Sequence, residues 1–227
     1  MALIGVGIYT PAEAAKLIGT ESREVKRWLF GYAFRAHGAS DRRNSPPLWT
    51  SQHAEDGQLV GFRDLLELRI VKAFVKHGVS LLVIRRVLEN AQQMFGHSYP
   101  FTAMRFLTDG RTIFHEASKH SGDGGLTDLK SKQVVFTEVI RHSLYAGIEF
   151  DNRGVAKRWH PLHGSRAIVL DPEISFGKPI ISGTGVPTAT IADAVRAEKS
   201  FTRVAQLYDL KPAEVRSAVR FEEKLAA

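Results

Sequence analysis

Two short helical segments on either side of one glycine, near the beginning of the chain, limit the possible fold more than any other pattern. Thr10 can cap a helix, Pro11 fits the first turn of that helix, and Glu13 can reach back to the cap. Gly19 can end this helix in the left-handed conformation, and a second helix over residues 20–30, capped by its first residue, can then begin. Two short helices joined by a tight, glycine-containing turn are typical of a helix-turn-helix unit.

The second predicted helix carries its basic and apolar residues on opposite faces. At about 100° per residue, Arg23, Lys26 and Arg27 fall within one arc, and Trp28 with its apolar neighbours falls on the other. The apolar arc can pack against the first helix, which leaves the basic arc free to enter a DNA major groove. The alternative is a solvated basic face on a structural helix, but the preceding helix and turn favour DNA binding.

A polar stretch over residues 38–57 follows and has the length of a hairpin wing, although it could instead be a mobile surface loop. In the wing interpretation, Arg42 and Arg43 contact backbone phosphates. Charge agrees with an anionic partner, because the net charge is +7 and +4 of it lies in the first 97 residues. The residues that we expect at double-stranded DNA are Ser22, Arg23, Lys26, Arg27, Arg35, Arg42 and Arg43.

Two longer helices are predicted next. From about residue 63 to residue 77 the apolar residues recur with helical spacing, and Gly78 ends the pattern. Ser80 can cap a fourth helix that continues through Leu88, with Arg85 and Arg86 directed outward.

Three stretches keep the order, spacing and caps of a known DNA-binding head: Tyr9-Thr10-Pro11-Ala12-Glu13-Ala14-Ala15, Arg23-Glu24-Val25-Lys26-Arg27-Trp28, and Phe62-Arg63-Asp64-Leu65-Leu66 with the helix pair that it opens. Over residues 8–90 they resemble the winged helix-turn-helix of MerR-type regulators, which implies binding to operator DNA. The long dimerisation helix of that family is missing, because Gly96 and Pro100 soon follow the fourth helix. We still expect a homodimer, since one short recognition helix reads too few bases alone.

Residues 98–165 are predicted to form a small α+β unit. Asp109-Gly110 lies between the apolar runs 104–108 and 112–115, which is a strong signal for a β-hairpin. A second hairpin is predicted from strands over 148–150 and 155–159. Residues 120–125 are predicted as a loop, and periodicity leaves residues 134–144 open between helix and strand.

The C-terminal residues 166–227 combine a turn-rich stretch with three predicted helices. A short strand over 167–170 precedes the turns, and the helices are expected over 189–197, 200–208 and 212–226. The turn-rich stretch contains Asp171, Pro172, Gly177, Lys178, Pro179, Gly183, Thr184 and Pro187.

This series of Asp-Pro, Gly-Lys-Pro, Gly-Thr and Val-Pro resembles domain-of-unknown-function family four-three-three over the whole segment. Members of that family are predicted antitoxins of toxin–antitoxin pairs, and they usually carry Arg where this chain has Gly185. A MerR-like head joined to such a segment resembles one branch of the VapB-type antitoxins. That resemblance implies a PIN-like ribonuclease toxin as the partner and a head that represses its own operon.

Basic residues of the C-terminal segment are candidate contacts to such a toxin. Arg216, Arg220 and Lys224 recur four residues apart on the last predicted helix, as a solvated face, a DNA contact or a counterpart to toxin carboxylates. The interleaved Glu222 and Glu223 favour the solvated face. The Gly-Lys-Pro turn fixes local structure in one interpretation, whereas in the other its lysine meets an acidic nuclease pocket. The possible toxin contacts are therefore Lys178, Arg216 and Arg220.

Signals for enzymatic chemistry are weak. The chain has no cysteine, which excludes disulfides, thiolate nucleophiles and Cys-based zinc sites, and its histidines lack a metal-site spacing. Asp171 and Glu173 could hold the metal of a nuclease, but Pro172 between them favours a turn in which Asp171 caps its own backbone. We predict no catalytic residue, no cofactor and no bound metal.

Taken together, these patterns predict an α+β protein with a MerR-like DNA-binding domain over 1–97, a hairpin-rich unit over 98–165 and a three-helix, helix-turn-helix-like domain over 166–227. The predicted function is an antitoxin and autorepressor, and the alternative is a stand-alone MerR-like regulator without a toxin. Since no apolar run approaches about 20 residues and the first residues lack a secretory pattern, we expect a cytoplasmic protein without a membrane partner.

Overall fold

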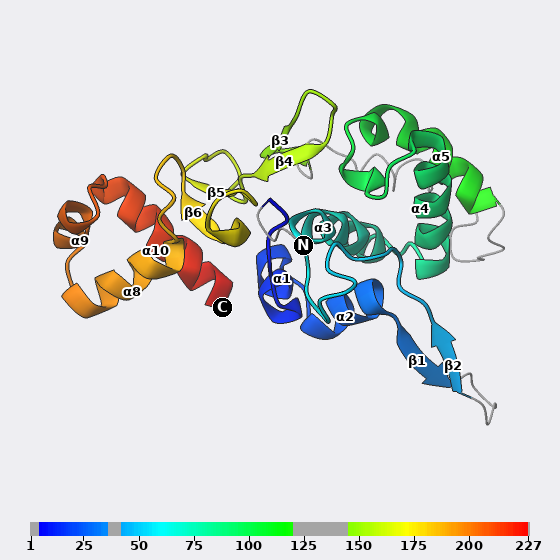
Figure 1. Ribbon diagram of the computed structural model, residues 1–227, viewed down its shortest axis with the longest axis horizontal. Coiled ribbons are helices and arrows are strands. Elements are labelled where there is room, and N and C mark those ends of the chain that lie inside the picture. The colour runs from blue at the N-terminus through cyan, green and yellow to red at the C-terminus, as the bar shows by residue number, and fades with distance from the viewer. Residues whose placement is uncertain (1–4, 36–41, 120–144, 227) are drawn as a thin grey trace.

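The computed structural model describes residues 5–35, 42–119 and 145–226. It has a mixed α+β architecture in which an N-terminal head, a central sheet and a C-terminal helical tail follow one another (Figure 1). We use "head" for residues 5–95 and "tail" for residues 168–226. Within the described parts of the chain, no helix is long and apolar enough to cross a membrane.

The head begins with the predicted pair of short helices. Helix α1 has the expected caps: the amide of Glu13 donates to the Thr10 hydroxyl, and Gly19 is left-handed with φ 69°. Helix α2 begins later than predicted, because Glu21 is its N-cap residue and the Thr20 hydroxyl donates to the Glu24 side chain instead. A two-stranded antiparallel hairpin, the wing, follows α2 directly. The bounds are α1 Pro11–Ile18, α2 Ser22–Phe30, β1 Tyr32–Arg35 and β2 Arg42–Ser45.

Helices α3 (Phe62–Lys76) and α4 (Leu81–Phe95) complete the head, and Ser80 caps α4 as predicted. Two carboxylates are buried on α3. Asp64 accepts hydrogen bonds from Trp49 Nε1 at 2.8 Å and from the amide of Gly61 at 2.9 Å, which fixes the segment before α3. Glu67 has no exposed surface and accepts from the Thr102 amide at 2.8 Å and the Thr102 hydroxyl at 2.9 Å.

The hairpin predicted around Asp109-Gly110 is wrong, because a continuous helix, α5 (Arg105–Lys119), runs through this dipeptide after the 3-10 turn η1 (Pro100–Thr102). The helix forms because Phe106, Ile113 and Phe114 bury one of its faces. The rings of Phe114 and Phe74 stack with centroids 5.4 Å apart. Burial of large side chains therefore outweighs a local turn signal. The predictions for 120–125 and 134–144 lie outside the described residues.

The central sheet has four antiparallel strands in the order β3-β4-β5-β6. Its first two strands confirm the hairpin predicted near residue 150. The proposed boundary at residue 166 lies between two paired strands, since Trp159 of β4 is opposite Leu170 of β5. These two residues also join the apolar core of the head, so the sheet is continuous with both parts. The bounds are β3 Ile148–Phe150, β4 Ala156–Trp159, β5 Ile168–Leu170 and β6 Pro179–Ile181.

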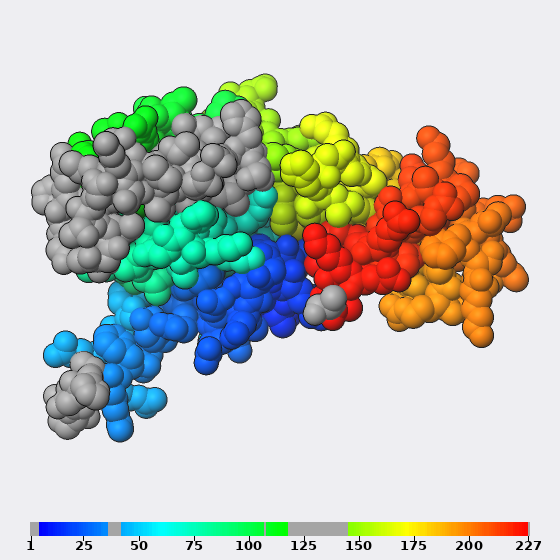
Figure 2. Space-filling model, turned by 180° about the vertical axis from the view of Figure 1, so that it is seen from behind, coloured from blue at the N-terminus to red at the C-terminus, as the bar shows by residue number. Residues whose placement is uncertain are grey.

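The tail contains the three predicted helices, which enclose a second apolar core with Ile168 and Ile181 of the sheet. Its helices are α8 Thr188–Glu198, α9 Phe201–Leu207 and α10 Pro212–Ala226. The far end of α10 reaches α1, and both views show this helix beside the N-terminal residues (Figures 1 and 2). Head and tail are thus in contact through helices that lie near opposite ends of the sequence.

Buried Glu67 predicts a pH-dependent stability. Burial raises the pKa of Glu67 from 4.5 to about 8, so the folded protein holds this proton more tightly than the unfolded chain does. The contribution of Glu67 to the free energy of unfolding is fully present below pH 4.5 and is lost as the pH rises through 8. Relative to Glu67→Gln, the wild type should therefore lose on the order of 3 kcal/mol between pH 5 and pH 8.5 in urea unfolding. Parallel pH profiles of the two proteins, or the same change in the exposed control Glu89→Gln, would contradict this assignment.

Candidate functional site

Helix α2 separates its charged and apolar residues as the sequence indicates. Arg23, Lys26 and Arg27 are exposed, whereas Trp28 is buried between the helices of the head. The fourth candidate on this helix, Ser22, is half-buried at the first position of α2. The exposed surface of α2 is therefore basic and continuous.

Arg27 lies toward the base of the wing. Its guanidinium is 4.3 Å from the centre of the Tyr32 ring, and a hydrogen bond from Arg27 lowers the pKa of that tyrosine. Arg23 pairs with Glu21 at 3.5 Å, and both side chains are more than two-thirds exposed. Such a pair contributes little to stability, which leaves Arg23 available to another partner.

The wing places further arginines at the surface. Its first strand begins at residue 32 and its second strand ends at residue 45, so the predicted wing over 38–57 starts too late and ends too far along the chain. Arg35 and Arg42 are paired directly opposite each other, and both are exposed. Like charges in opposite positions destabilise a hairpin unless an anion lies between them. The exposed Arg43 adds a third guanidinium to this strand pair.

The residues that follow the wing pack back on the head. The polar stretch over residues 38–57 therefore extends beyond the wing itself. The Leu48 amide donates to the Trp28 carbonyl at 2.8 Å. Arg85 was expected to point outward, but its guanidinium donates to the carbonyls of Pro46 and Pro47 at 2.8 and 2.6 Å. Arg86 is also half-buried, so the prediction of two outward arginines on α4 is wrong. Arg85 packs because α4 lies beside this returning segment.

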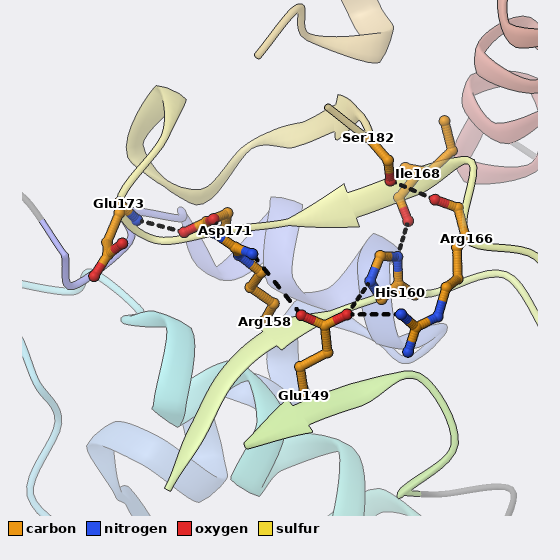
Figure 3. Close-up of polar contacts among 8 residues, drawn as sticks. All are labelled: Glu149, Arg158, His160, Arg166, Ile168, Asp171, Glu173 and Ser182. Carbon is orange, nitrogen blue, oxygen red and sulfur yellow. Dashed lines mark hydrogen bonds and ion pairs between the residues drawn. The ribbon is translucent and has the colours of Figure 1, made fainter. Parts of the chain in front are cut away.

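Asp171 in the tail is a buried member of a polar network at the sheet (Figure 3). Its side chain is 1% exposed, and one oxygen accepts from Arg158 Nε at 2.5 Å. The other oxygen accepts from the Glu173 amide at 2.9 Å, which is the self-capping turn that the proline indicated. The hydrogen bond to Asp171 raises the pKa of Arg158. Asp171 therefore holds strands β4 and β5 together.

Glu149 extends this network across the sheet. It lies 3.1 Å from His160 Nε2, 3.1 Å from Arg166 and 3.9 Å from Arg158, while His160 Nδ1 lies 3.1 Å from the Ile168 carbonyl. These contacts join β3, β4 and the start of β5 (Figure 3). The side chain of Glu173 points away from Asp171, and the described residues contain no cluster of His, Asp and Glu suited to a metal.

The Gly-Lys-Pro turn of the tail is attached to the N-terminal segment. The buried Tyr9 hydroxyl donates to the Gly177 carbonyl at 2.6 Å, and the Ile8 amide donates to the Phe176 carbonyl at 2.9 Å. Gly177 has φ 78°, and a Cβ there would lie 2.5 Å from Tyr9 Oη. Burial raises the pKa of Tyr9, which therefore stays protonated as a donor. This glycine is required both by its backbone conformation and by the close approach of Tyr9.

The remaining residues of the tail pattern shape the connection to α8. The Thr184 hydroxyl donates to the Ile181 carbonyl at 2.9 Å and closes the turn that contains Gly183, whose φ is 82°. Pro187 precedes α8 and is its N-cap residue, while Pro179 begins β6. Gly185 has φ 74°, a region that favours glycine. Pro172 is buried, and its carbonyl accepts from the Gly5 amide at 3.1 Å.

The candidate toxin contacts are all at the surface. Lys178 is exposed beside the Gly177 turn, and Arg216 and Arg220 are exposed on one side of α10. Tyr9 and Arg158, which hold the tail in place, were not among the predicted site residues. No local pattern could have identified them, because each acts through a partner in another element.

Comparison with known proteins gives three similarities. Residues 168–221 match a family described as "Protein of unknown function (DUF433)", which agrees with the resemblance of the tail. The chain is 28% identical over 228 residues to "Putative antitoxin VapB45" of Mycobacterium tuberculosis (strain ATCC 25618 / H37Rv), covering 94% of this chain and 93% of that protein. The X-ray crystal structure of Rv2018 from Mycobacterium tuberculosis has a similar fold, with a TM-score of 0.67 and 23% identity over 95% of this chain and 98% of that one.

The Tyr9–Gly177 contact predicts how the tail responds to substitution. Gly177→Ala should destabilise the protein by about 3 kcal/mol, because it adds a clash with Tyr9 Oη to the strain of a left-handed alanine. Gly183→Ala carries the same strain in open space and should cost about 1 kcal/mol. Urea unfolding compares the two variants. Tyr9→Phe removes the clashing oxygen, so its combination with Gly177→Ala should cost less than the two single changes added together; strict additivity would contradict the contact.

Proposed function

We propose that this protein is the antitoxin of a type II toxin–antitoxin system, which neutralises a PIN-like ribonuclease toxin by direct binding and represses its own operon. The observation that carries the proposal is the likeness to a relative named as an antitoxin, because it extends over nearly the whole length of both chains. The match to the DUF433 family lies in the tail alone. Both similarities favour a regulatory protein without enzymatic activity.

The DNA-binding part of the proposal rests on the head. In this proposal, the MerR-like head inserts α2 into the major groove, where Arg23, Lys26 and Arg27 face the DNA. The arginines of the wing, Arg35, Arg42 and Arg43, contact phosphates. The exposed basic face of α2 and the opposed Arg35 and Arg42 of the wing support this assignment. Phosphate contacts release counterions, so the affinity for DNA should fall steeply with salt. A cytoplasmic homodimer on a palindromic operator agrees with the short recognition helix.

The toxin-binding part of the proposal rests on the tail. Lys178, Arg216 and Arg220 are exposed and could pair with carboxylates of an acidic nuclease site. The tail is fastened to the head by the hydrogen bonds of Tyr9 and Ile8, so a toxin bound there would be held on the same body as the DNA-binding surface.

A stand-alone regulator is the second candidate, because the basic head with its wing needs no toxin to bind DNA. A metal-dependent nuclease is not supported, since both oxygens of Asp171 accept internal hydrogen bonds and Glu173 points away.

Arg27 tests the DNA-binding assignment. Arg27→Ala should weaken binding to DNA from upstream of the protein's own reading frame by about 1–3 kcal/mol in a gel shift, if this side chain reads a base edge. Arg27→Lys keeps the charge but loses the planar fork, so it should restore non-specific binding better than specific binding. Arg216→Ala on α10 is the control and should leave the affinity unchanged. Equal binding by Arg27→Ala and the wild type would remove Arg27 from the interface.

Co-expression with the protein encoded by the adjacent reading frame tests the toxin partnership. The neighbour alone should arrest growth, and this chain should restore growth and co-purify with a tagged neighbour. A neighbour that neither binds nor arrests growth would contradict the antitoxin proposal and favour the stand-alone regulator.

A further inference from the structure

A cleft lies between the first helix of the head and the tail. It has a volume of about 270 Å³, and its walls include Lys16 and Leu17 of α1 on one side and Lys178, Pro179 and Leu225 on the other. The two walls meet because the Tyr9–Gly177 hydrogen bond fixes the tail against the N-terminal segment. Figure 2 shows the end of α10 against the N-terminal part of the chain at this junction.

The acidic residues of the cleft are already engaged by internal donors. Glu13 accepts from the Thr10 amide at 2.7 Å and the Thr10 hydroxyl at 2.8 Å, where it caps α1. Glu222 accepts a hydrogen bond from the Thr188 hydroxyl, which joins α10 to α8. These carboxylates stabilise the start of α1 and the packing of α10 on α8, and each of them uses one oxygen for these bonds.

The basic residues of the cleft are not engaged. In the portion of the chain that the structure describes, neither Lys16 nor Lys178 has a side-chain hydrogen bond or an ion pair, and both are exposed. One ammonium group comes from the head and the other from the tail. The surfaces of Leu17, Pro179 and Leu225 lie in the same cleft. The cleft therefore presents two cationic donors next to an apolar wall.

This chemistry fits a carboxylate that is followed by an apolar group. Whole small-molecule ligands usually occupy pockets of about 300–1,000 Å³, so a cleft of about 270 Å³ accommodates one or two side chains of a protein better than a complete ligand. We propose that the cleft is a docking site for an acidic side chain and an adjacent apolar side chain of the toxin partner. The inference rests on the proposed function and extends it by naming the surface and the chemistry of the partner segment.

Docking in this cleft would differ from binding to the tail alone. Its occupant would touch α1, which packs against α2, and also the segment that carries Lys178. Arg216 and Arg220 do not line the cleft, so their substitution should weaken binding of the partner less than substitution of Lys178. This distinguishes the cleft from a toxin surface formed by Arg216 and Arg220.

Charge reversal in the cleft tests the inference by isothermal titration against the purified protein encoded by the adjacent reading frame. The double variant Lys16→Glu/Lys178→Glu should bind that protein at least tenfold more weakly than the wild type. Lys211→Glu makes the same kind of change at an exposed position outside the cleft and should bind within twofold of the wild type. Melting temperatures of the three proteins check that each variant is folded, since Lys16 lies in the last turn of α1 and a reversed charge there changes stability slightly.

A zero-length carbodiimide crosslinker gives an independent readout, because it joins an amine to a carboxylate only where the two are in contact. Mass spectrometry of the wild-type complex should find Lys16 or Lys178 linked to an Asp or Glu of the partner, and no such link for Lys211. Unchanged affinity of the double variant without these crosslinks would overturn the cleft and leave the antitoxin function intact. If the wild-type protein does not bind the neighbour at all, both the cleft and the proposed function are overturned.

Discussion

The hydrogen bond from the Tyr9 hydroxyl to the Gly177 carbonyl is the contact on which the arrangement of this protein depends. It joins residues 168 positions apart, and the backbone bond from Ile8 to Phe176 lies beside it. Tyr9 also pairs with Val60 in an antiparallel bridge just before α3. One buried tyrosine, directly before the helix-turn-helix pair, therefore joins the segment before α3 to the turn of the tail. The cleft and the shared orientation of head and tail both follow from this contact.

The polar network around Asp171 links strands β3 and β4 to the residues on either side of β5. Asp171 pairs with Arg158, while Glu149 pairs with Arg166 and lies 3.1 Å from His160, so opposite charges meet at this sheet. Removing one partner from such a pair leaves an uncompensated charge, which costs far more than the pair itself contributes. The acidic and proline residues of the tail pattern thus have a structural role, and Lys178 is left as the exposed charged member of the pattern.

Local signals in the sequence were sufficient where the structure is local. The caps at Thr10, Gly19 and Ser80 and the opposite faces of α2 depend on residues a few positions apart, and all of them are found as predicted. The prediction of a hairpin at Asp109-Gly110 was wrong because contacts with residues distant in sequence decide between hairpin and helix. One of these contacts is the stacking of Phe114 on Phe74 of α3. The wing was placed too late for a similar reason, since residues 46–49 are drawn back to α2 and α4. Contacts such as Tyr9–Gly177 and Arg158–Asp171 have no sequence signature, because the two residues of each contact are not related by any local spacing pattern.

The central claim is that one body carries both a DNA-binding head and a toxin-binding tail. The most direct test is size-exclusion chromatography with light scattering on a mixture of this protein, DNA from upstream of its reading frame and the protein encoded by the adjacent frame. The account predicts a single species whose mass includes all three components, with the protein present as a dimer. Elution of DNA and neighbour in separate species, each without the other, would contradict it.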